Sequence, residues 1–131
     1  MKKGSLLNAE LSRIIAEMGH TDGLVICDAG LPIPGGVSRI DLAVRCGEPP
    51  FLSVLETVLA ELEVERAVMA SELKTHRGPV LEGIHRLLHD RPIETVPHEV
   101  FKTSTHSCRA IVRTGECSPY ANIILYSGVV F

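Results

Sequence analysis

The sequence predicts a single α/β domain with a central, mostly parallel sheet and helices on both faces. The chain has 131 residues, the size of one domain, and 45% of them are hydrophobic, which favours a packed core over disorder. Short runs made only of apolar residues alternate with amphipathic stretches at helical spacing, the pattern of buried strands between covering helices. We therefore expect residues 1–131 to fold as one unit.

The first elements are indicated by a helix cap and by a buried run. Asn8 suits a helix N-cap, apolar residues follow it at helical spacing, and Gly19 provides a stop, so a helix is expected over residues 9–18. The apolar run at residues 24–27 predicts a strand that is buried on both faces. Prolines and glycines make residues 28–36 a loop.

The remainder of the chain repeats this alternation. The expected elements are an edge strand around residues 40–42, a helix over 51–64, a strand over 67–70, a helix over 80–88, a strand over 93–96, a helical turn from Pro97, and strands over 110–112, 123–126 and 129–131. Ligands of such sheets bind beyond the carboxyl ends of the strands, so polar residues at those ends are candidates for a site.

Composition disfavours several classes of function. The net charge is -3, from 13 basic and 16 acidic residues, and only 4% of residues are aromatic, so binding to nucleic acid is not expected. No stretch reaches transmembrane length, and Asn8 interrupts the short apolar start of the chain before a signal peptide could form. We therefore expect a cytoplasmic protein that does not contact a membrane.

The four cysteines do not predict a metal centre. Cys27, Cys46, Cys108 and Cys117 form no C-x-x-C pair, and their wide spacings fit no zinc motif. In a reducing cytosol we expect them to be small residues of the core or the surface.

His20 and Asp28 are the first candidates for chemistry. His20 lies just past the first helix, and Asp28 ends the first buried strand. A carboxylate at the end of such a strand needs a partner or faces a cleft. Position alone favours the plainer explanation, in which Asp28 caps the following loop and His20 is a surface residue.

Two further pairs of polar residues could hold a polyol. His98 and Lys102 are four residues apart and share a face of the helical turn after Pro97, although a solvated helix surface explains them as well. Tyr120 and Asn122 flank one residue, so their side chains point the same way if the backbone is extended. A phenol and an amide supply the donors and acceptors that a polyol needs, and turn chemistry is the alternative.

Taken in order, these motifs resemble the ribose pyranase/fucose mutarotase family, and its ribose pyranase branch in particular. The matching segments are LN at residues 7–8, GHTD at 19–22, DAGLPIP at 28–34, IDL at 40–42, HEVFK at 98–102, RTGE at 113–116, PYAN at 119–122 and GVVF at 128–131. Each segment alone is weak, but their order along nearly the whole chain is specific.

The resemblance implies exchange between the pyranose and furanose forms of free D-ribose by acid–base ring opening and closing, without a cofactor or a metal. It implies that His20 is the catalytic acid. The residues implied to contact the sugar are Asp28, His98, Tyr120 and Asn122, with Lys102 in support. The alternatives are a fucose-type anomer mutarotase and a non-catalytic sugar-binding accessory protein of a transporter.

The resemblance also implies a ring-shaped homo-oligomer of two stacked pentamers, a decamer. The apolar end of the chain at residues 129–131 independently predicts an interface, because contiguous exposed apolar residues usually mark one. Residues 116–122 lie just upstream on the same strand. We therefore expect burial of the chain end to bring them close to a neighbouring subunit that completes the site.

Overall fold

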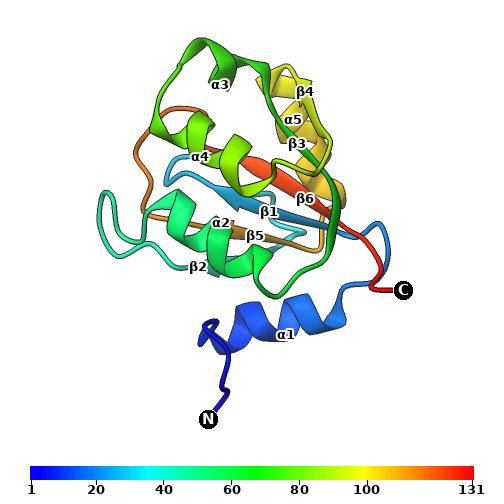
Figure 1. The fold of residues 1–131 in the computed structure, drawn as a ribbon. Helices are drawn as coiled ribbons and strands as arrows, with labels where there is room; N and C mark the ends of the chain where they lie inside the picture. Colours follow the sequence, from blue (N-terminus) through cyan, green and yellow to red (C-terminus); the bar gives the residue numbers. More distant parts are fainter.

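A six-stranded sheet in the order β2-β5-β1-β6-β3-β4 runs through the computed structural model, which describes residues 1–131 (Figure 1). The strands are β1 Gly23–Cys27, β2 Ser38–Asp41, β3 Val64–Ala70, β4 Ile93–Val96, β5 Ala110–Arg113 and β6 Ile123–Ser127. β6 is antiparallel to its neighbours β1 and β3, and all other neighbouring strands are parallel. The predicted sheet, with an edge strand at β2, is confirmed.

Helices cover both faces of this sheet, as predicted. They are α1 Ala9–Glu17, α2 Phe51–Leu59, α3 Ser71–Thr75, α4 Pro79–Leu87, α5 His98–Ser104 and a 3-10 turn, η1, at Thr105–Ser107. The larger apolar core lies between the sheet and α1, α2 and α4, and the smaller one lies on the face covered by α5 (Figure 1). None of the helices is both long and apolar enough to span a bilayer.

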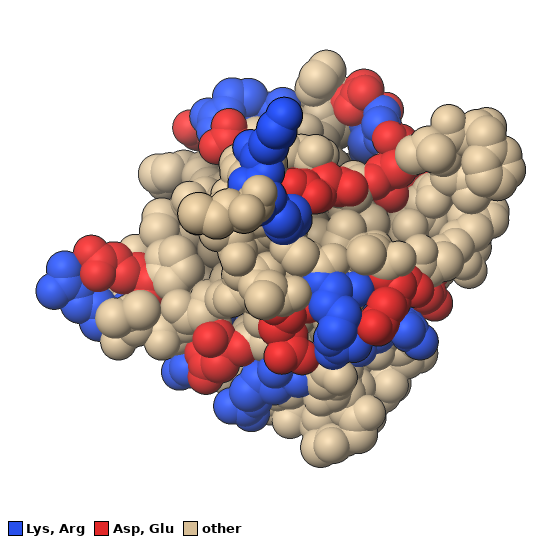
Figure 2. Space-filling model, turned by 90° about the horizontal axis from the view of Figure 1, so that it is seen from below, with Lys and Arg blue, Asp and Glu red and all other residues tan.

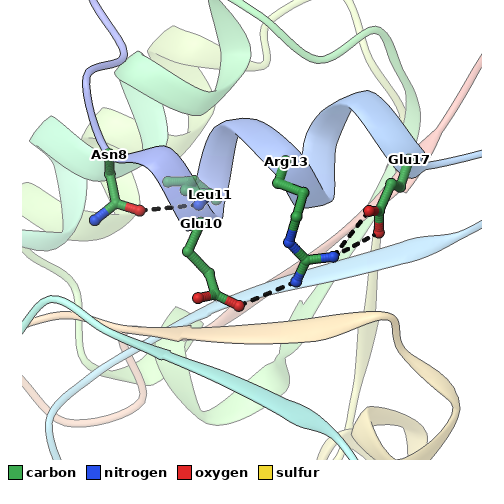
Figure 3. A network of polar contacts seen from close by, with 5 residues as sticks. All are labelled: Asn8, Glu10, Leu11, Arg13 and Glu17. Carbon is green, nitrogen blue, oxygen red and sulfur yellow. Dashed lines mark hydrogen bonds and ion pairs between the residues drawn. The ribbon is translucent and has the colours of Figure 1, made fainter.

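α1 begins where its cap predicts. Asn8 Oδ1 accepts a hydrogen bond from Leu11 N at 2.9 Å, and Arg13 bridges Glu10 and Glu17 along the exposed side of the helix (Figure 3). Acidic and basic side chains are interspersed on the face seen in Figure 2, with no continuous basic area. That face offers no surface suited to a phosphate backbone.

Two expected elements differ from the structure. The second helix ends at Leu59 rather than at residue 64, because the chain turns and Val64 already starts β3. Leu62 lies in the turn after the helix and packs against the same core, so its spacing resembles that of a helix although the helix has ended. The strand expected at residues 129–131 is wrong: these residues form no strand, and Phe131 is fully exposed.

Candidate active site

The carboxyl edge of the sheet gathers most of the predicted sugar-binding residues. Asp28 directly follows β1, and His98 opens α5 directly after β4 and Pro97. Asn122 precedes β6, and because β6 runs antiparallel, its start lies at the same edge as the end of β1. The topology therefore brings together residues that are up to 94 positions apart in the sequence.

Asp28 and Asn122 form a closed pair of hydrogen bonds. Asp28 N donates to Asn122 Oδ1 at 2.9 Å, and Asn122 Nδ2 donates to Asp28 Oδ2 at 3.0 Å. Gly30 N donates to the other carboxylate oxygen, Asp28 Oδ1, at 2.9 Å. Each oxygen keeps a lone pair, and Asp28 is only half-buried, so the carboxylate can still accept from a ligand.

Tyr120 lies against two imidazole rings. Its ring centroid is 5.1 Å from that of His98, edge to face, and 5.1 Å from that of His76. Tyr120 has φ 61°, so the assumption of an extended backbone is wrong, and Tyr120 and Asn122 are not placed side by side by strand alternation. Asn122 instead points to Asp28, while Tyr120 packs against the start of α5.

Glu72 fixes the start of α5. Pro97 precedes α5 and provides no side-chain cap, and both carboxylate oxygens of Glu72 accept from His98 N, at 3.1 and 3.0 Å. The parallel pairing of Ala70 with Val96 brings the two segments together. The hydrogen bonds from His98 N hold the pKa of Glu72 below its ordinary value. Glu72 lies in α3, so a residue of another element holds His98 in place at the start of α5.

The β5–β6 loop, residues 114–122, is anchored at several points. Thr114 Oγ1 donates to Cys27 O at 2.7 Å, and Ala29 N donates to Glu116 O at 2.8 Å. Glu116 Oε2 accepts from Phe51 N at 3.1 Å and so caps α2. Burial raises the pKa of Glu116, but hydrogen bonds from Phe51 N and Ser118 N outweigh it and lower the pKa overall.

A surface cavity of about 360 Å³ adjoins this loop and provides room for a sugar. Its lining includes Asp28, Gly30, Glu116, Cys117 and Pro119. A second cavity of about 270 Å³ is also lined by Ser118 and Pro119, together with His76.

The cysteines differ from expectation in one respect. Cys27 and Cys108 are buried, as core residues should be, but Cys46 and Cys117 form a disulfide with their Cα atoms 5.9 Å apart. The 71 residues between them conceal this proximity in the sequence, because only the tertiary contact between their loops creates it.

His20 does not join the group at the carboxyl edge. It precedes β1, whereas Asp28 follows that strand, so the length of β1 separates them, about 16 Å for its residues. At the opposite edge, exposed His20 Nε2 lies 2.8 Å from Glu65 Oε2. Within one chain the predicted acid and the predicted sugar-binding residues are therefore apart.

Lys102 is also displaced from the group. Its Nζ pairs with Glu99 Oε1 at 2.6 Å. It lines a separate cavity of about 320 Å³ with residues 32–34 and His106, on the face of the sheet that α5 covers. The i, i+4 spacing to His98 thus puts Lys102 one helical turn away along α5.

Three residues of the site were not assigned from the sequence: Glu72, His76 and Glu116. Glu72 follows a buried strand, which is the one signal that could have singled it out. Glu116 lies in the RTGE segment at residues 113–116, which indicated the segment but not its role, and His76 carries no local signal. No group of three or more His, Cys, Asp or Glu side chains is placed to hold a metal ion.

Comparison with known proteins supplies the family. Residues 1–130 match the RbsD / FucU transport protein family. D-ribose pyranases of Laribacter hongkongensis and Geobacillus thermodenitrificans are 56% and 54% identical to the chain over all of it and over 100% and 99% of their own lengths.

Two solved structures share the fold over the full length of both chains. Bacillus subtilis RbsD complexed with D-ribose superposes with a TM-score of 0.96 at 43% identity. The fucose mutarotase of Streptococcus pneumoniae in complex with L-fucose gives a TM-score of 0.82 at 25% identity. With its family match spanning nearly every residue and relatives above 50% identity, this chain belongs to the RbsD/FucU family.

Proposed function

We propose that this protein interconverts the pyranose and furanose forms of free D-ribose, an isomerase activity that needs no cofactor. The observation that carries the proposal is the full-length likeness to Bacillus subtilis RbsD in complex with D-ribose. Curated relatives described as D-ribose pyranases support it. The polar group formed by Asp28, His98, Tyr120 and Asn122 supplies chemistry suited to a polyol.

The chemistry follows from the substrate. A pyranose is a cyclic hemiacetal, so ring exchange requires a proton delivered to the ring oxygen and another removed from the anomeric hydroxyl. The open chain then rotates and closes on a different hydroxyl. His20 is proposed as the acid, because an imidazole exchanges protons near neutral pH.

The proposed sugar contacts follow from the free hydrogen-bonding atoms. Asp28 accepts from sugar hydroxyls with its remaining lone pairs, and Tyr120 offers its phenol. His98 Nδ1 is buried and has no hydrogen-bond partner within the chain, so the imidazole retains unused hydrogen-bonding capacity. Lys102 is proposed to support the site from its own helical turn.

We propose further that the site is shared between subunits. The apolar tail and His20 lie at the same edge of the sheet, since Thr21 N donates to Ser127 O and the tail follows immediately. A head-to-tail contact through that edge would carry His20 of one copy to the carboxyl edge of the next. Repeated heterologous contacts of this kind close into a ring when the rotation between subunits allows it, which agrees with the decamer expected from the resemblance.

The residues that burial of the tail would bring to a neighbour differ from those expected from the sequence. β6 carries the chain away from residues 116–122, so the tail lies beside its own His20 and not beside its own Tyr120. Burial of the tail would therefore bring the acid, rather than the β5–β6 loop, to a neighbour. The expected cytoplasmic location stays a prediction.

Saturation-transfer NMR with catalytic amounts of protein tests the proposal. Exchange between the ring forms of D-ribose should be accelerated, and more than exchange between the anomers of L-fucose. Faster exchange of fucose would favour the mutarotase alternative. Binding of ribose by calorimetry without any accelerated exchange would favour the sugar-binding accessory protein.

A further inference from the structure

The disulfide joins the wall of the candidate sugar cavity to a neighbouring loop. Cys117 belongs to the β5–β6 loop and lines the same cavity as Asp28. Cys46 belongs to the loop between β2 and α2, residues 42–50. Their Cα separation of 5.9 Å lies in the range that a disulfide requires, and both residues are exposed.

We propose that Cys46 and Cys117 are a reversible thiol–disulfide modification site that sets how firmly the β5–β6 loop is held, and thereby the affinity for the sugar. The effect on the sugar rests on the proposed function, whereas the cysteine chemistry and its effect on the loop do not.

Only this pair is suited to exchange with thiols in solution. Cys27 and Cys108 are buried, and burial raises the pKa of Cys27 to about 12 and that of Cys108 to about 11. The thiolate is the reactive form, so these two thiols are inert in the folded protein. Because Cys46 and Cys117 are exposed and Cys27 and Cys108 are buried, thiol–disulfide exchange should occur only at Cys46 and Cys117.

The geometry couples the pair to the sugar cavity through direct backbone contact. Gly115 N donates to Pro49 O at 2.9 Å, and Gly47 N donates to Gly115 O at 2.6 Å. A side chain at Gly115 would meet the backbone oxygens of Arg45 and Glu48. The two loops therefore touch whether or not the sulfurs are joined, and the disulfide adds a covalent link next to this contact.

The reaction balances with the disulfide of a low-molecular-weight thiol such as glutathione. The thiolate of one cysteine attacks that disulfide, forming a mixed disulfide and releasing one small thiol. The second cysteine thiolate then attacks the protein sulfur of the mixed disulfide and releases the second small thiol. The protein dithiol is oxidised and the small disulfide is reduced.

Linkage makes the effect reciprocal. The disulfide and the bound sugar both favour the loop conformation in which Asn122 meets Asp28, so each stabilises the other. We expect the oxidised protein to bind D-ribose about fivefold more tightly than the reduced protein, at the low end of typical coupling because backbone contacts persist without the disulfide. Because the coupling is reciprocal, the same fivefold factor means that saturating D-ribose should lower the reduction potential of the pair by about 20 mV.

The test equilibrates the full-length protein in glutathione buffers of defined potential, with Cys46→Ser as the matched control. Alkylation, peptide mapping, hydrogen exchange and D-ribose calorimetry are then measured on the same samples. We expect a linked Cys46–Cys117 peptide, slower exchange of amides in residues 114–122 and tighter D-ribose binding in the oxidised wild type only. Cys46→Ser should show none of these changes with potential.

Two results would overturn the proposal. The first is alkylation of both Cys46 and Cys117 even in the most oxidising buffer. The second is a linked pair with unchanged amide exchange in residues 114–122. If the protein bound no ribose at all, the proposed function would fail, while the peptide map and amide exchange would still decide the cysteine site. Ribose binding that is equally tight in both redox states would refute the coupling alone.

Discussion

His20 presents an exposed imidazole that lies 2.8 Å from the Glu65 carboxylate. We predict that His20→Ala lowers the rate of D-ribose ring exchange by about 10²–10⁴-fold, the usual contribution of a positioned acid. The fold should persist, because this side chain adds little to the core, and circular dichroism checks that. Glu65→Gln is the control: it keeps the imidazole and should retain most of the rate. A folded His20→Ala protein with the wild-type rate would remove the role assigned to His20.

Asp28 allows a test of sugar binding. In Asp28→Asn an amide replaces a carboxylate oxygen that accepts from Asn122 Nδ2, so two donors face one another and a charge-assisted acceptor is lost. Affinity for D-ribose should fall by about 1.5–3 kcal/mol, roughly tenfold to 150-fold, as measured by titration calorimetry. Asp90→Asn, an exposed change outside this group, should leave the affinity unchanged. Equal affinities of Asp28→Asn and wild type would count against the contact.

Among the secondary-structure elements, α5 depends on Glu72 for its cap. The pKa of Glu72 is lowered in the folded protein by the hydrogen bonds from His98 N, so its contribution to stability is present above the ordinary pKa of 4.5 and is lost as the pH falls through the lowered value. Glu72→Gln should therefore unfold at a lower temperature than wild type at neutral pH. The difference between the two proteins should shrink below about pH 4.

Thermal unfolding at fixed protein concentration across this pH range measures the effect of Glu72. Glu56→Gln is the control, because Glu56 is exposed on α2 and changes the charge equally without capping α5. A constant difference between Glu72→Gln and wild type at every pH would show that the carboxylate charge does not stabilise the helix.

The same helices show what a sequence can and cannot predict. Local patterns predicted α1, α2, α4 and all six strands, with the end of α2 misplaced, because burial on one or two faces leaves a recognisable pattern. α2 and α5 both begin after a proline and have no local cap. Their caps, Glu116 and Glu72, come from distant segments, and no local pattern encodes a tertiary contact.

For the whole molecule, topology decides how the site is built. The motifs predicted a set of residues to contact a sugar, and strand order explains why Asp28 meets Asn122 and why His98 meets Tyr120. The sequence could not indicate that the antiparallel β6 sends the tail to the edge of His20. Under the shared site that we propose, each subunit carries two half-sites, one at each end of its sheet.

Removal of residues 129–131 tests the assembly. Exposed Val129, Val130 and Phe131 form a contiguous apolar end, so their deletion should lower the size of the assembly. The exchange rate should fall with it by about 10²–10⁴-fold, because no neighbour supplies His20. Light scattering after size-exclusion chromatography, beside the NMR assay, measures both. Val130→Leu with Phe131→Leu keeps the end apolar and should preserve both the assembly and the rate. A fully active monomer after deletion would refute the shared site.

The most direct test of a ribose site shared between subunits is complementation between two inactive variants. His20→Ala and Asp28→Ala each damage a different half-site, so random co-assembly should restore about a quarter of the sites if every site takes His20 and Asp28 from neighbouring chains. We predict that the refolded or co-expressed mixture regains about a quarter of the wild-type rate of D-ribose ring exchange by saturation-transfer NMR. A mixture that stays inactive, while wild-type protein taken through the same treatment recovers its rate, would contradict it.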